Sequence, residues 1–284
     1  MIHQTTKGNN LIADSGATKT EWCLTCDGEI LQRFYGKGLS PVYQTEEEIA
    51  EEIRLQVRPH LKEREIHAIH FYGSGCTPDK SHLVEKALYS SFPIESIHVF
   101  SDLVAAAHSL CGDAPGIACI LGTGSNSCEW SGSEIISHVS PLGFILGDEG
   151  SGAAMGKQLV GDALKNQLTL GLKEKLLEEY QLTPALIIDK VYRQPFPSRF
   201  LASLAPFLLS YIADDSIYRI VFRGFSDFFE RNVMQYDYHE QTVHFVGSIA
   251  WHFADILRKV ATTKGITIGQ IEQSPMPGLI NYYK

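Results

Sequence analysis

Two short turns rich in glycine, serine and threonine constrain this chain more than any other feature. The first reads Asp14-Ser15-Gly16-Ala17-Thr18-Lys19-Thr20, and the second reads Gly122-Thr123-Gly124-Ser125-Asn126-Ser127. Each turn lies between two apolar, strand-like runs, so each is expected to form the tip of a hairpin. Glycine lets a phosphate approach backbone N–H groups closely, and short hydroxyl side chains add further donors. The pair therefore predicts two hairpins whose tips bind one anion.

Either turn alone is better explained as an ordinary hairpin made of turn-forming residues. Phosphate binding is favoured because the two turns occur in order and further motifs follow them. Asp14 ends a strand beside the first turn. It is therefore a candidate to hold Mg²⁺ through water, since magnesium prefers a few carboxylates together with phosphate oxygens.

Composition limits the classes of protein to which the chain can belong. With 284 residues, 44% hydrophobic and 20% charged, it is typical of a globular protein of two ordinary domains. A formal charge of −9 and the lack of a basic stripe argue against a nucleic-acid partner and favour a small molecule. No run approaches the roughly 18 apolar residues of a membrane span. The polar first ten residues lack the apolar core of a signal peptide, so we expect a cytoplasmic protein.

The six cysteines are scattered and predict reduced, mostly buried thiols rather than a disulfide framework. Cys23 and Cys26 have the spacing of a redox or zinc motif, but no second pair follows to complete four ligands. A metal site built on cysteine is therefore disfavoured.

The first hundred residues alternate strand-like and helix-like segments. Asp27-Gly28 predicts a tight hairpin turn, and Thr45 with Glu48 predicts a helix that opens with a capping box. We expect strands at 10–13, 21–26, 30–35, 66–72 and 96–100, and helices at 45–62 and after Pro78. Antiparallel strands that lead into alternating helices and strands imply a mixed sheet with helices packed on it.

The same pattern then starts again, which suggests that one αβ unit is duplicated. The boundary is expected near residues 108–115. We expect strands at 116–121, 127–131, 134–137 and 242–246, a mostly helical stretch at 149–237, and a helix at 249–262.

Five segments in this order resemble the nucleotide-binding motifs of the actin, heat-shock ATPase and sugar kinase superfamily. They read DSGATKT, SDLVAAAHS, ILGTGSNSCEW, LGFILGDEGSGAAMGKQLV and VGSIAWHFADIL. Within that superfamily the chain most resembles the N-acetylglucosamine kinase branch, grouped with the BadF/BadG/BcrA/BcrD ATPase family. The resemblance covers nearly the whole chain.

The resemblance implies an α/β fold of two ribonuclease-H-like, actin-like ATPase domains with a nucleotide cleft between them. The N-terminal domain would span 1–110, and a C-terminal helix at about 272–284 would pack back on it. The C-terminal domain would span 111–271 and carry a helical insertion. The apolar C-terminal stretch could instead form a contact in a homodimer.

ATP and Mg²⁺ are the cofactors that the resemblance implies. The residues expected to bind the phosphates of ATP are Gly16, Ala17, Thr18, Lys19, Thr20, Gly122, Thr123, Gly124 and Ser125. Gly247 and Ser248 match the adenosine motif. Without the resemblance, they are better explained as a strand-to-helix turn with Ser248 as the cap.

Asp102 is the expected catalytic residue. It follows a strand and opens an alanine-rich helix, which places it at a strand end where α/β clefts form. A carboxylate there can accept the proton of a sugar hydroxyl that attacks a γ-phosphoryl group. The residues alone favour a helix N-cap for Asp102, whereas the resemblance assigns it as general base.

Three further residues are expected to contact the sugar. Asp148 lies in a glycine-flanked loop and can accept two hydroxyls, and Asn126 follows the second turn, whereas Glu149 is assigned to structure. Ser40 stands before Pro41 where related kinases often carry an asparagine. Because serine is shorter, this departure leaves the identity of the sugar open.

The expected function is phosphorylation of an amino sugar by ATP, at the 6-hydroxyl of N-acetylglucosamine or a close relative. One alternative is a BadF-type ATPase that activates a partner reductase through an iron–sulfur cluster. Cys128 lies near the second turn, but no second cysteine ligand is evident. Another alternative is a non-catalytic sugar or nucleotide sensor.

Overall fold

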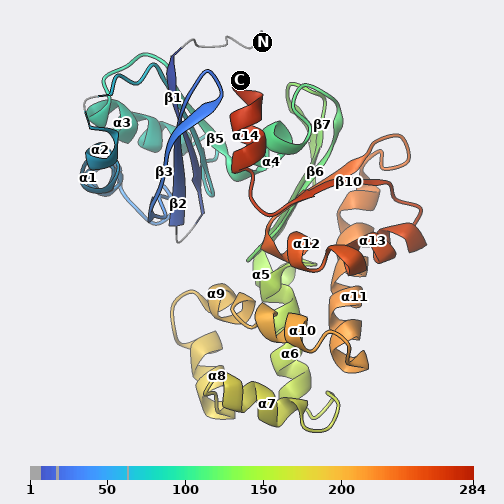
Figure 1. The fold of residues 1–284 in the computed structure, drawn as a ribbon. Coiled ribbons are helices and arrows are strands. Elements are labelled where there is room, and N and C mark those ends of the chain that lie inside the picture. Colours follow the sequence, from blue (N-terminus) through green and yellow to red (C-terminus); the bar gives the residue numbers. More distant parts are fainter. Residues whose placement is uncertain (1–7, 17–18, 63) are drawn as a thin grey trace. The chain divides into compact units, whose positions relative to one another are not determined.

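The computed structural model describes residues 8–16, 19–62 and 64–284 (Figure 1). This part of the chain divides into two compact units. Unit 1 comprises Met1–Asp113 together with Pro275–Lys284, and unit 2 comprises Ala114–Ser274.

Unit 1 contains a five-stranded mixed sheet. Its strands are β1 (Asn9–Ser15), β2 (Lys19–Cys26), β3 (Glu29–Lys37), β4 (Ala68–Gly73) and β5 (Ile97–Ser101). They lie in the order β3-β2-β1-β4-β5, with β1, β2 and β3 antiparallel and with β4 and β5 parallel to β1. Asp27 and Gly28 both have positive φ, +47° and +82°. They make the predicted two-residue hairpin turn, whose twist suits the flanking strands.

Alternate residues of β1 pack into separate cores on the two faces of the unit 1 sheet. Leu11 and Ala13 lie in the core with α1, α2 and α3, whereas Ile12 lies in the core with α4 and α14 (Figure 1). The two-residue period of a strand produces this division. The helices of unit 1 are α1 (Glu46–Gln56), α2 (Arg58–Leu61), α3 (Ser81–Ser91), α4 (Asp102–Leu110) and α14 (Met276–Tyr282).

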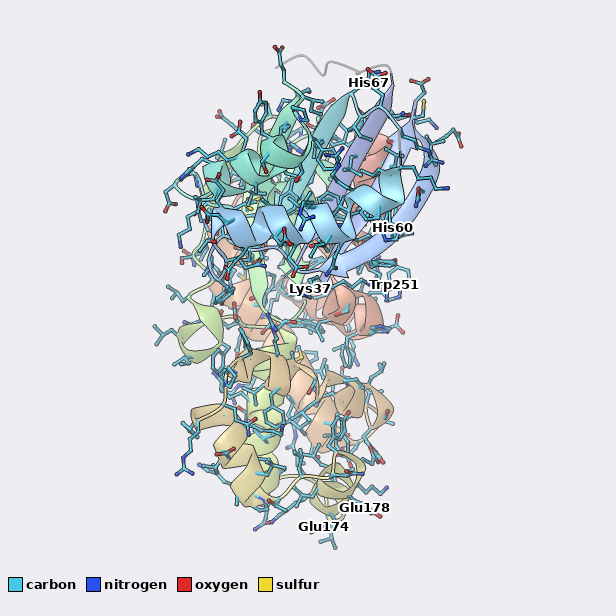
Figure 2. The ribbon with its side chains drawn as sticks, turned by 90° about the vertical axis from the view of Figure 1, so that its left-hand side faces the viewer. Lys37, His60, His67, Glu174, Glu178 and Trp251 are labelled. Atoms are coloured by element: carbon cyan, nitrogen blue, oxygen red, sulfur yellow. The ribbon has the colours of Figure 1, made fainter. Side chains whose placement is uncertain are left out.

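The helix expected at 45–62 begins as predicted but divides in two. Thr45 and Glu48 form the capping box. The division falls at Val57, because Pro59 has no N–H to continue the helical bonding and its ring clashes with the preceding turn. Figure 2 labels Lys37 and His60 beside α1 and α2. The His60 ring stacks on Phe34 with centroids 4.4 Å apart, which ties α2 to β3.

Unit 2 repeats the topology of unit 1. Its strands are β6 (Gly116–Leu121), β7 (Ser125–Trp130), β8 (Ile135–His138), β9 (Val243–Val246) and β10 (Ile268–Glu272). In chain order these strands have the same neighbours and directions as β1 to β5. The predicted restart of the strand pattern is therefore confirmed. The strand β10 was not predicted; it is short and has an irregular register between Ile268 and Ile271.

A long helical region separates the third and fourth strands of unit 2. Its α7 is amphipathic, with Leu172 and Leu176 buried and with Glu174 and Glu178 exposed (Figure 2). The helices of unit 2 are α5 (Gly143–Leu146), α6 (Gly152–Leu164), α7 (Leu172–Glu179), α8 (Pro184–Tyr192), α9 (Pro197–Ala202), α10 (Ala205–Ser210), α11 (Asp215–Arg231), the short 3₁₀ helix η1 (Val233–Gln235), α12 (Ser248–His252) and α13 (Ala254–Thr263).

The described helices and cysteines agree with two expectations from composition. None of these helices combines the length and apolarity needed to cross a bilayer. All six cysteines are free thiols, as their scattered positions predicted.

Candidate active site

Unit 1 gathers carboxyl groups where its parallel strands end. Asp14 lies near the end of β1, and Asp102 directly follows β5. Burial raises the pKa of Asp14 to about 7, and the charges of Glu21 and Asp102 add to this increase. Burial also raises the pKa of Asp102. The two carboxyls are therefore poorly solvated and close enough to repel one another.

Asp102 does not cap the helix that it opens. Ser101 is the N-cap of α4, and its hydroxyl accepts the Val104 N–H at 3.3 Å. The cap that the residues alone favoured for Asp102 is therefore wrong by one position. Burial raises the pKa of Asp102, and the polar groups of its own N–H, the Leu103 N–H and the Ser74 side chain oppose that increase.

The first predicted phosphate turn is partly described. The Gly16 N–H donates to the Lys19 carbonyl at 3.0 Å, while Ala17 and Thr18 lie outside the described residues. Thr20 is fully buried and its hydroxyl donates to the Lys37 carbonyl at 2.8 Å. The side chain of Thr20 therefore stabilises the hairpin through this hydrogen bond.

The second predicted phosphate turn is docked on the start of α6. The Gly122 N–H donates to the Gly124 carbonyl at 2.9 Å. The carbonyls of Gly122 and Thr123 accept the N–H groups of Gly152 and Ala153 at 2.9 and 3.0 Å. Within the described residues, the N–H groups of Thr123 and Gly124 have no protein partner. Two backbone donors are thus available to an anion.

Asp148 brings a carboxylate to this second turn. Its Oδ1 accepts the Ser125 N–H at 3.3 Å, and a Cβ placed on Gly124 would lie 3.1 Å from Oδ2. The residue has φ +54°, and its N–H donates to the Pro141 carbonyl at 2.9 Å. Burial raises the pKa of Asp148, and the Ser125 N–H opposes that increase. The loop thus holds this carboxylate in a left-handed conformation that aspartate tolerates better than most residues.

Glu149 and Asn126 have different environments. Glu149 pairs with Arg231, with Oε1 and Nε 2.5 Å apart, and its assignment to structure stays a prediction. The Asn126 Oδ1 accepts the Ser127 N–H at 3.0 Å and lies 2.9 Å from the His138 Nε2. The amide nitrogen of Asn126 makes no hydrogen bond within the described residues, so it is free to donate to a ligand.

Gly247 joins β9 to α12 in a conformation and a space that require glycine. It has φ +125°, and a Cβ there would lie 2.3 Å from the Leu121 carbonyl oxygen. Gly247 occupies the N-cap position of α12, and Ser248 is the first helical residue and makes no cap hydrogen bond. The alternative in which Ser248 caps this helix is therefore wrong. The close approach brings the backbone of the adenosine-like motif to the end of β6, beside Gly122.

Ser40 is buried, and its hydroxyl donates to the Ser74 carbonyl at 3.0 Å. The sequence motifs predict Ser40 as a sugar contact but do not indicate Ser74. The signal for Ser74 was the run Gly73-Ser74-Gly75 at the end of a buried strand, where small residues let other loops approach closely.

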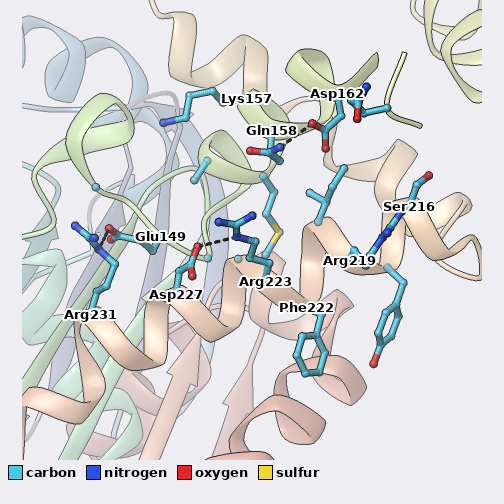
Figure 3. A pocket seen from close by; sticks show the side chains of 18 of the residues that line it. Glu149, Lys157, Gln158, Asp162, Ser216, Arg219, Phe222, Arg223, Asp227 and Arg231 are labelled. Atoms are coloured by element: carbon cyan, nitrogen blue, oxygen red, sulfur yellow. Dashed lines mark hydrogen bonds and ion pairs between the residues drawn. The ribbon is translucent and has the colours of Figure 1, made fainter. Parts of the chain in front are cut away.

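A separate hollow of about 850 Å³ lies within unit 2 (Figure 3). It is lined by the glycine-rich loop beside Asp148, by α6 and by α11. Lys157 and Arg223 line it, and Arg223 lies 3.9 Å from Asp227. Sequence analysis missed this hollow because charged residues along a helix are typical of a solvated face.

Comparisons with known proteins identify the family. No family profile and no curated protein matches the chain. A solved structure of a candidate N-acetylglucosamine kinase from Porphyromonas gingivalis is 47% identical, covers 96% of this chain and 98% of its own, and has a TM-score of 0.94. This protein therefore belongs to the N-acetylglucosamine kinase-like family, as its motifs predicted.

More distant structures share the fold. A candidate N-acetylglucosamine kinase from Chromobacterium violaceum is 18% identical with a TM-score of 0.75, over 98% of this chain and 99% of its own. The ROK hexokinase from Thermus thermophilus is 13% identical with a TM-score of 0.51, over 97% of both chains. The predicted α/β fold of two actin-like ATPase domains is thereby confirmed.

Proposed function

We propose that this protein is an ATP-dependent sugar kinase that phosphorylates the 6-hydroxyl of N-acetylglucosamine or a close relative. The observation that carries the proposal is the buried carboxyl group of Asp102, which directly follows β5 and whose pKa is raised by burial. A general base is most effective when its pKa lies near the working pH. The 47% identity to a candidate N-acetylglucosamine kinase supports the choice of sugar.

In the proposed reaction, the sugar hydroxyl oxygen forms a bond to the γ-phosphorus of ATP. The bond between that phosphorus and the β–γ bridging oxygen breaks, and ADP leaves with its electron pair. The hydroxyl proton passes to the Asp102 carboxylate. Positioning and electrostatic stabilisation then supply most of the rate enhancement, as is usual for phosphoryl transfer.

Unit 2 would supply most of the nucleotide contacts. The free N–H groups of Thr123 and Gly124, next to the start of α6, suit a phosphate. Gly247 suits close approach of the nucleoside to the backbone. The turn Gly16 to Thr20 in unit 1 stays a predicted phosphate-binding turn.

The sugar would be oriented by Asp148 and Asn126. The Asp148 carboxylate retains acceptor capacity beyond its bond to the Ser125 N–H, so it can accept sugar hydroxyls. The Asn126 amide nitrogen can donate to the same sugar. A direct contact from Ser40 also stays a prediction.

Magnesium would be held through the Asp14 carboxylate and the phosphate oxygens. Among the described residues, no three histidine, cysteine or acidic side chains are grouped to hold a metal by themselves. The carboxyl of Asp14 nevertheless fits a cation. Its pKa is raised by burial and by the negative charges of Glu21 and Asp102, and a bound cation would offset those charges. When bound, Mg²⁺ would neutralise charge on the phosphates.

Cys128 argues against the reductase-activator alternative. It is fully buried in β7, with 0% of its surface exposed. A cluster ligand shared across a dimer needs an accessible thiol, so Cys128 does not favour that function.

The test is ADP release with Mg²⁺-ATP across a panel of amino sugars, with the phosphorylated position identified by NMR. Wild type should release ADP only when an amino sugar is present, and Asp102→Asn should abolish this. Asp79→Asn is the matched control, because Asp79 is an exposed aspartate of unit 1 that is not assigned to the site. Sugar-independent hydrolysis by wild type, or equal activity in Asp102→Asn, would contradict the proposal.

A further inference from the structure

The backbone of Asp148 is held more firmly than its carboxylate. The hydrogen bond from the Ser125 N–H to Asp148 Oδ1 is long, at 3.3 Å. The Asp148 N–H donates to the Pro141 carbonyl at 2.9 Å, and the Asp148 carbonyl accepts the Ser151 N–H at 3.1 Å. The place of the carboxylate therefore depends on how well the surrounding loop is fixed.

The side chain of Glu149, the next residue, fixes that loop to the end of α11. Glu149 Oε1 lies 2.5 Å from Arg231 Nε, and Glu149 Oε2 accepts an N–H of the Asn232 amide at 3.5 Å. Figure 3 shows the Glu149 and Arg231 side chains pointing toward one another in the wall of the hollow in unit 2. Both carboxylate oxygens of Glu149 thus have donors from two consecutive residues at one helix end.

The end of α11 is a firm support for this contact. Asn232 is 5% exposed, and its side-chain amide also donates to the Phe228 carbonyl at 3.3 Å. Phe228 and Phe229 are fully buried, and their rings lie 6.2 and 5.9 Å from that of Phe245 in β9. A helix end packed in this way into a core moves less readily than an isolated loop.

Gly150 brings the loop against the same helix. It has φ +72°, and a Cβ there would lie 3.0 Å from Phe228 Cβ and 3.4 Å from the Gly224 carbonyl oxygen. This close packing opposes movement of the loop toward α11, and the ion pair of Glu149 opposes movement away from it. The two residues that follow Asp148 therefore restrict its backbone in both directions.

We infer that Glu149 and Arg231 are positioning residues: their ion pair holds the loop so that the Asp148 carboxylate can accept sugar hydroxyls. The inference rests on the proposed function, because that function assigns Asp148 to the sugar. It gives the predicted structural role of Glu149 a specific task. It also gives Arg231 a role that the sequence motifs did not indicate.

Steady-state kinetics separate positioning from a purely structural role. Glu149→Gln and Arg231→Gln should each raise KM for the sugar by about fivefold with little change in kcat, since a partly exposed ion pair has an effect of this size. A purely structural pair would lower the urea midpoint and leave KM unchanged, which would overturn the inference. Arg231→Lys keeps the positive charge and should restore part of the affinity for the sugar.

A double-mutant cycle tests whether Glu149 and Arg231 act as one pair. Because residues in one ion pair are not additive, KM in the double variant should stay close to that of either single variant. Full multiplication of the two losses would overturn the inference. Glu230→Gln is the matched control, because Glu230 precedes Arg231 in α11 and pairs at the same 2.5 Å separation, but with Lys264. An equal rise of KM in this control would also overturn the inference.

Crystal structures of wild type and Glu149→Gln test the inference without any activity. The Asp148 carboxylate should lie next to the Ser125 N–H in wild type and should be displaced from it in the variant, with the core of unit 2 unchanged. An Asp148 side chain in the same place in both structures would overturn the inference even if the protein is a kinase. Absence of sugar-dependent turnover in wild type would instead contradict the proposed function.

Discussion

Unit 1 and unit 2 share one strand order but carry different chemistry where their strands end. In unit 1 this end carries the carboxyl groups of Asp14 and Asp102, both with raised pKa. In unit 2 it carries the turn Gly122 to Gly124 and the close-packed Gly247, and its carboxylate, Asp148, comes from a connecting loop. A shared sheet therefore determines where a site can form, whereas the connections determine which groups fill it.

The connection between the third and fourth strands accounts for much of the difference. Among the described residues, this connection holds α1 and α2 in unit 1, but α5 to α11 and η1 in unit 2. The longer connection carries Asp148 and the start of α6, which contacts the second turn. The extra helices thus add both a carboxylate and backbone groups to the same sheet end.

The largest expected effect tests the role of the unit 1 carboxyls. Asp102→Asn should lower kcat by about 10²- to 10⁴-fold, the usual contribution of a general base. Nucleotide affinity, measured by calorimetry, should change little because Asp102 is not assigned to the phosphates. If Asp102→Asn keeps the kcat of wild type, the catalytic role assigned to the unit 1 carboxyls is wrong.

Gly247→Ala tests the close packing in unit 2. A side chain at φ +125° is strained, and its Cβ would overlap the Leu121 carbonyl, so we expect a loss of about 3 kcal/mol in the free energy of unfolding. Urea denaturation measures this. Gly265→Ala is the matched control, because Gly265 also has positive φ, +67°, but no atom lies within 4 Å of its added Cβ. Equal losses in both variants would show that the contact with Leu121 contributes nothing.

Asp148→Asn tests the carboxylate of unit 2. Asparagine tolerates the left-handed backbone at φ +54°, so the fold should be retained. Loss of charge-assisted hydrogen bonds should raise KM for the sugar by about tenfold or more, with a smaller change in kcat. If kcat falls as far as in Asp102→Asn, the assignment of separate roles to the two acids is wrong.

Substitutions of two equivalent histidines should give the smallest changes, and these changes are in the free energy of unfolding. His70 pairs with Ile12 and His244 pairs with Ala118, each three residues before the end of the first strand of its unit. Both ring nitrogens of His70 are buried without a hydrogen-bond partner, whereas His244 Nδ1 accepts the Gln270 N–H at 3.1 Å. We expect His70→Phe to stabilise the protein and His244→Phe to destabilise it, each by about 1 kcal/mol at pH 8.

Lowering the pH should enlarge the difference in the free energy of unfolding between His70→Phe and wild type. Burial lowers the pKa of His70 to about 3, with His98 and His108 adding to the decrease. The unfolded state therefore binds more protons below about pH 6.5, and stability is lost as the pH falls from there toward 3, by up to about 1.4 kcal/mol per pH unit. The gap between His70→Phe and wild type should thus widen from pH 7 to pH 5 in urea titrations. A constant gap would mean that His70 titrates normally.

Several features of the fold and site were predictable from short stretches of sequence. Asp27-Gly28 indicated a hairpin, and Thr45 with Glu48 indicated a helix start, because both signals depend on neighbouring residues. The order of the glycine turns and of the DEG and GSIA motifs indicated the family. The division of the helix at Val57 could also be predicted, since Pro59 cannot continue a helix.

Other features required contacts between distant residues. The cap of α4 could not be assigned between Ser101 and Asp102, because both types favour N-caps and adjacent positions compete. The hydrogen bond from the Ser40 hydroxyl to the Ser74 carbonyl joins residues that lie 34 positions apart in the chain. The strand β10 was missed because its pairing with β9 is short and irregular.

By itself, the sequence determined the kind and order of the local elements and the turns that could bind phosphate. Backbone preferences, side-chain periodicity and caps act over a few residues, so these features can be derived from neighbouring residues in the chain. Only the tertiary structure decided that the carboxyls of Asp14 and Asp102 are crowded and have raised pKa values, and that the hydroxyl of Ser40 is donated to Ser74. Burial and long-range hydrogen bonds produce those properties, and they exist only once the sheet brings separate loops together.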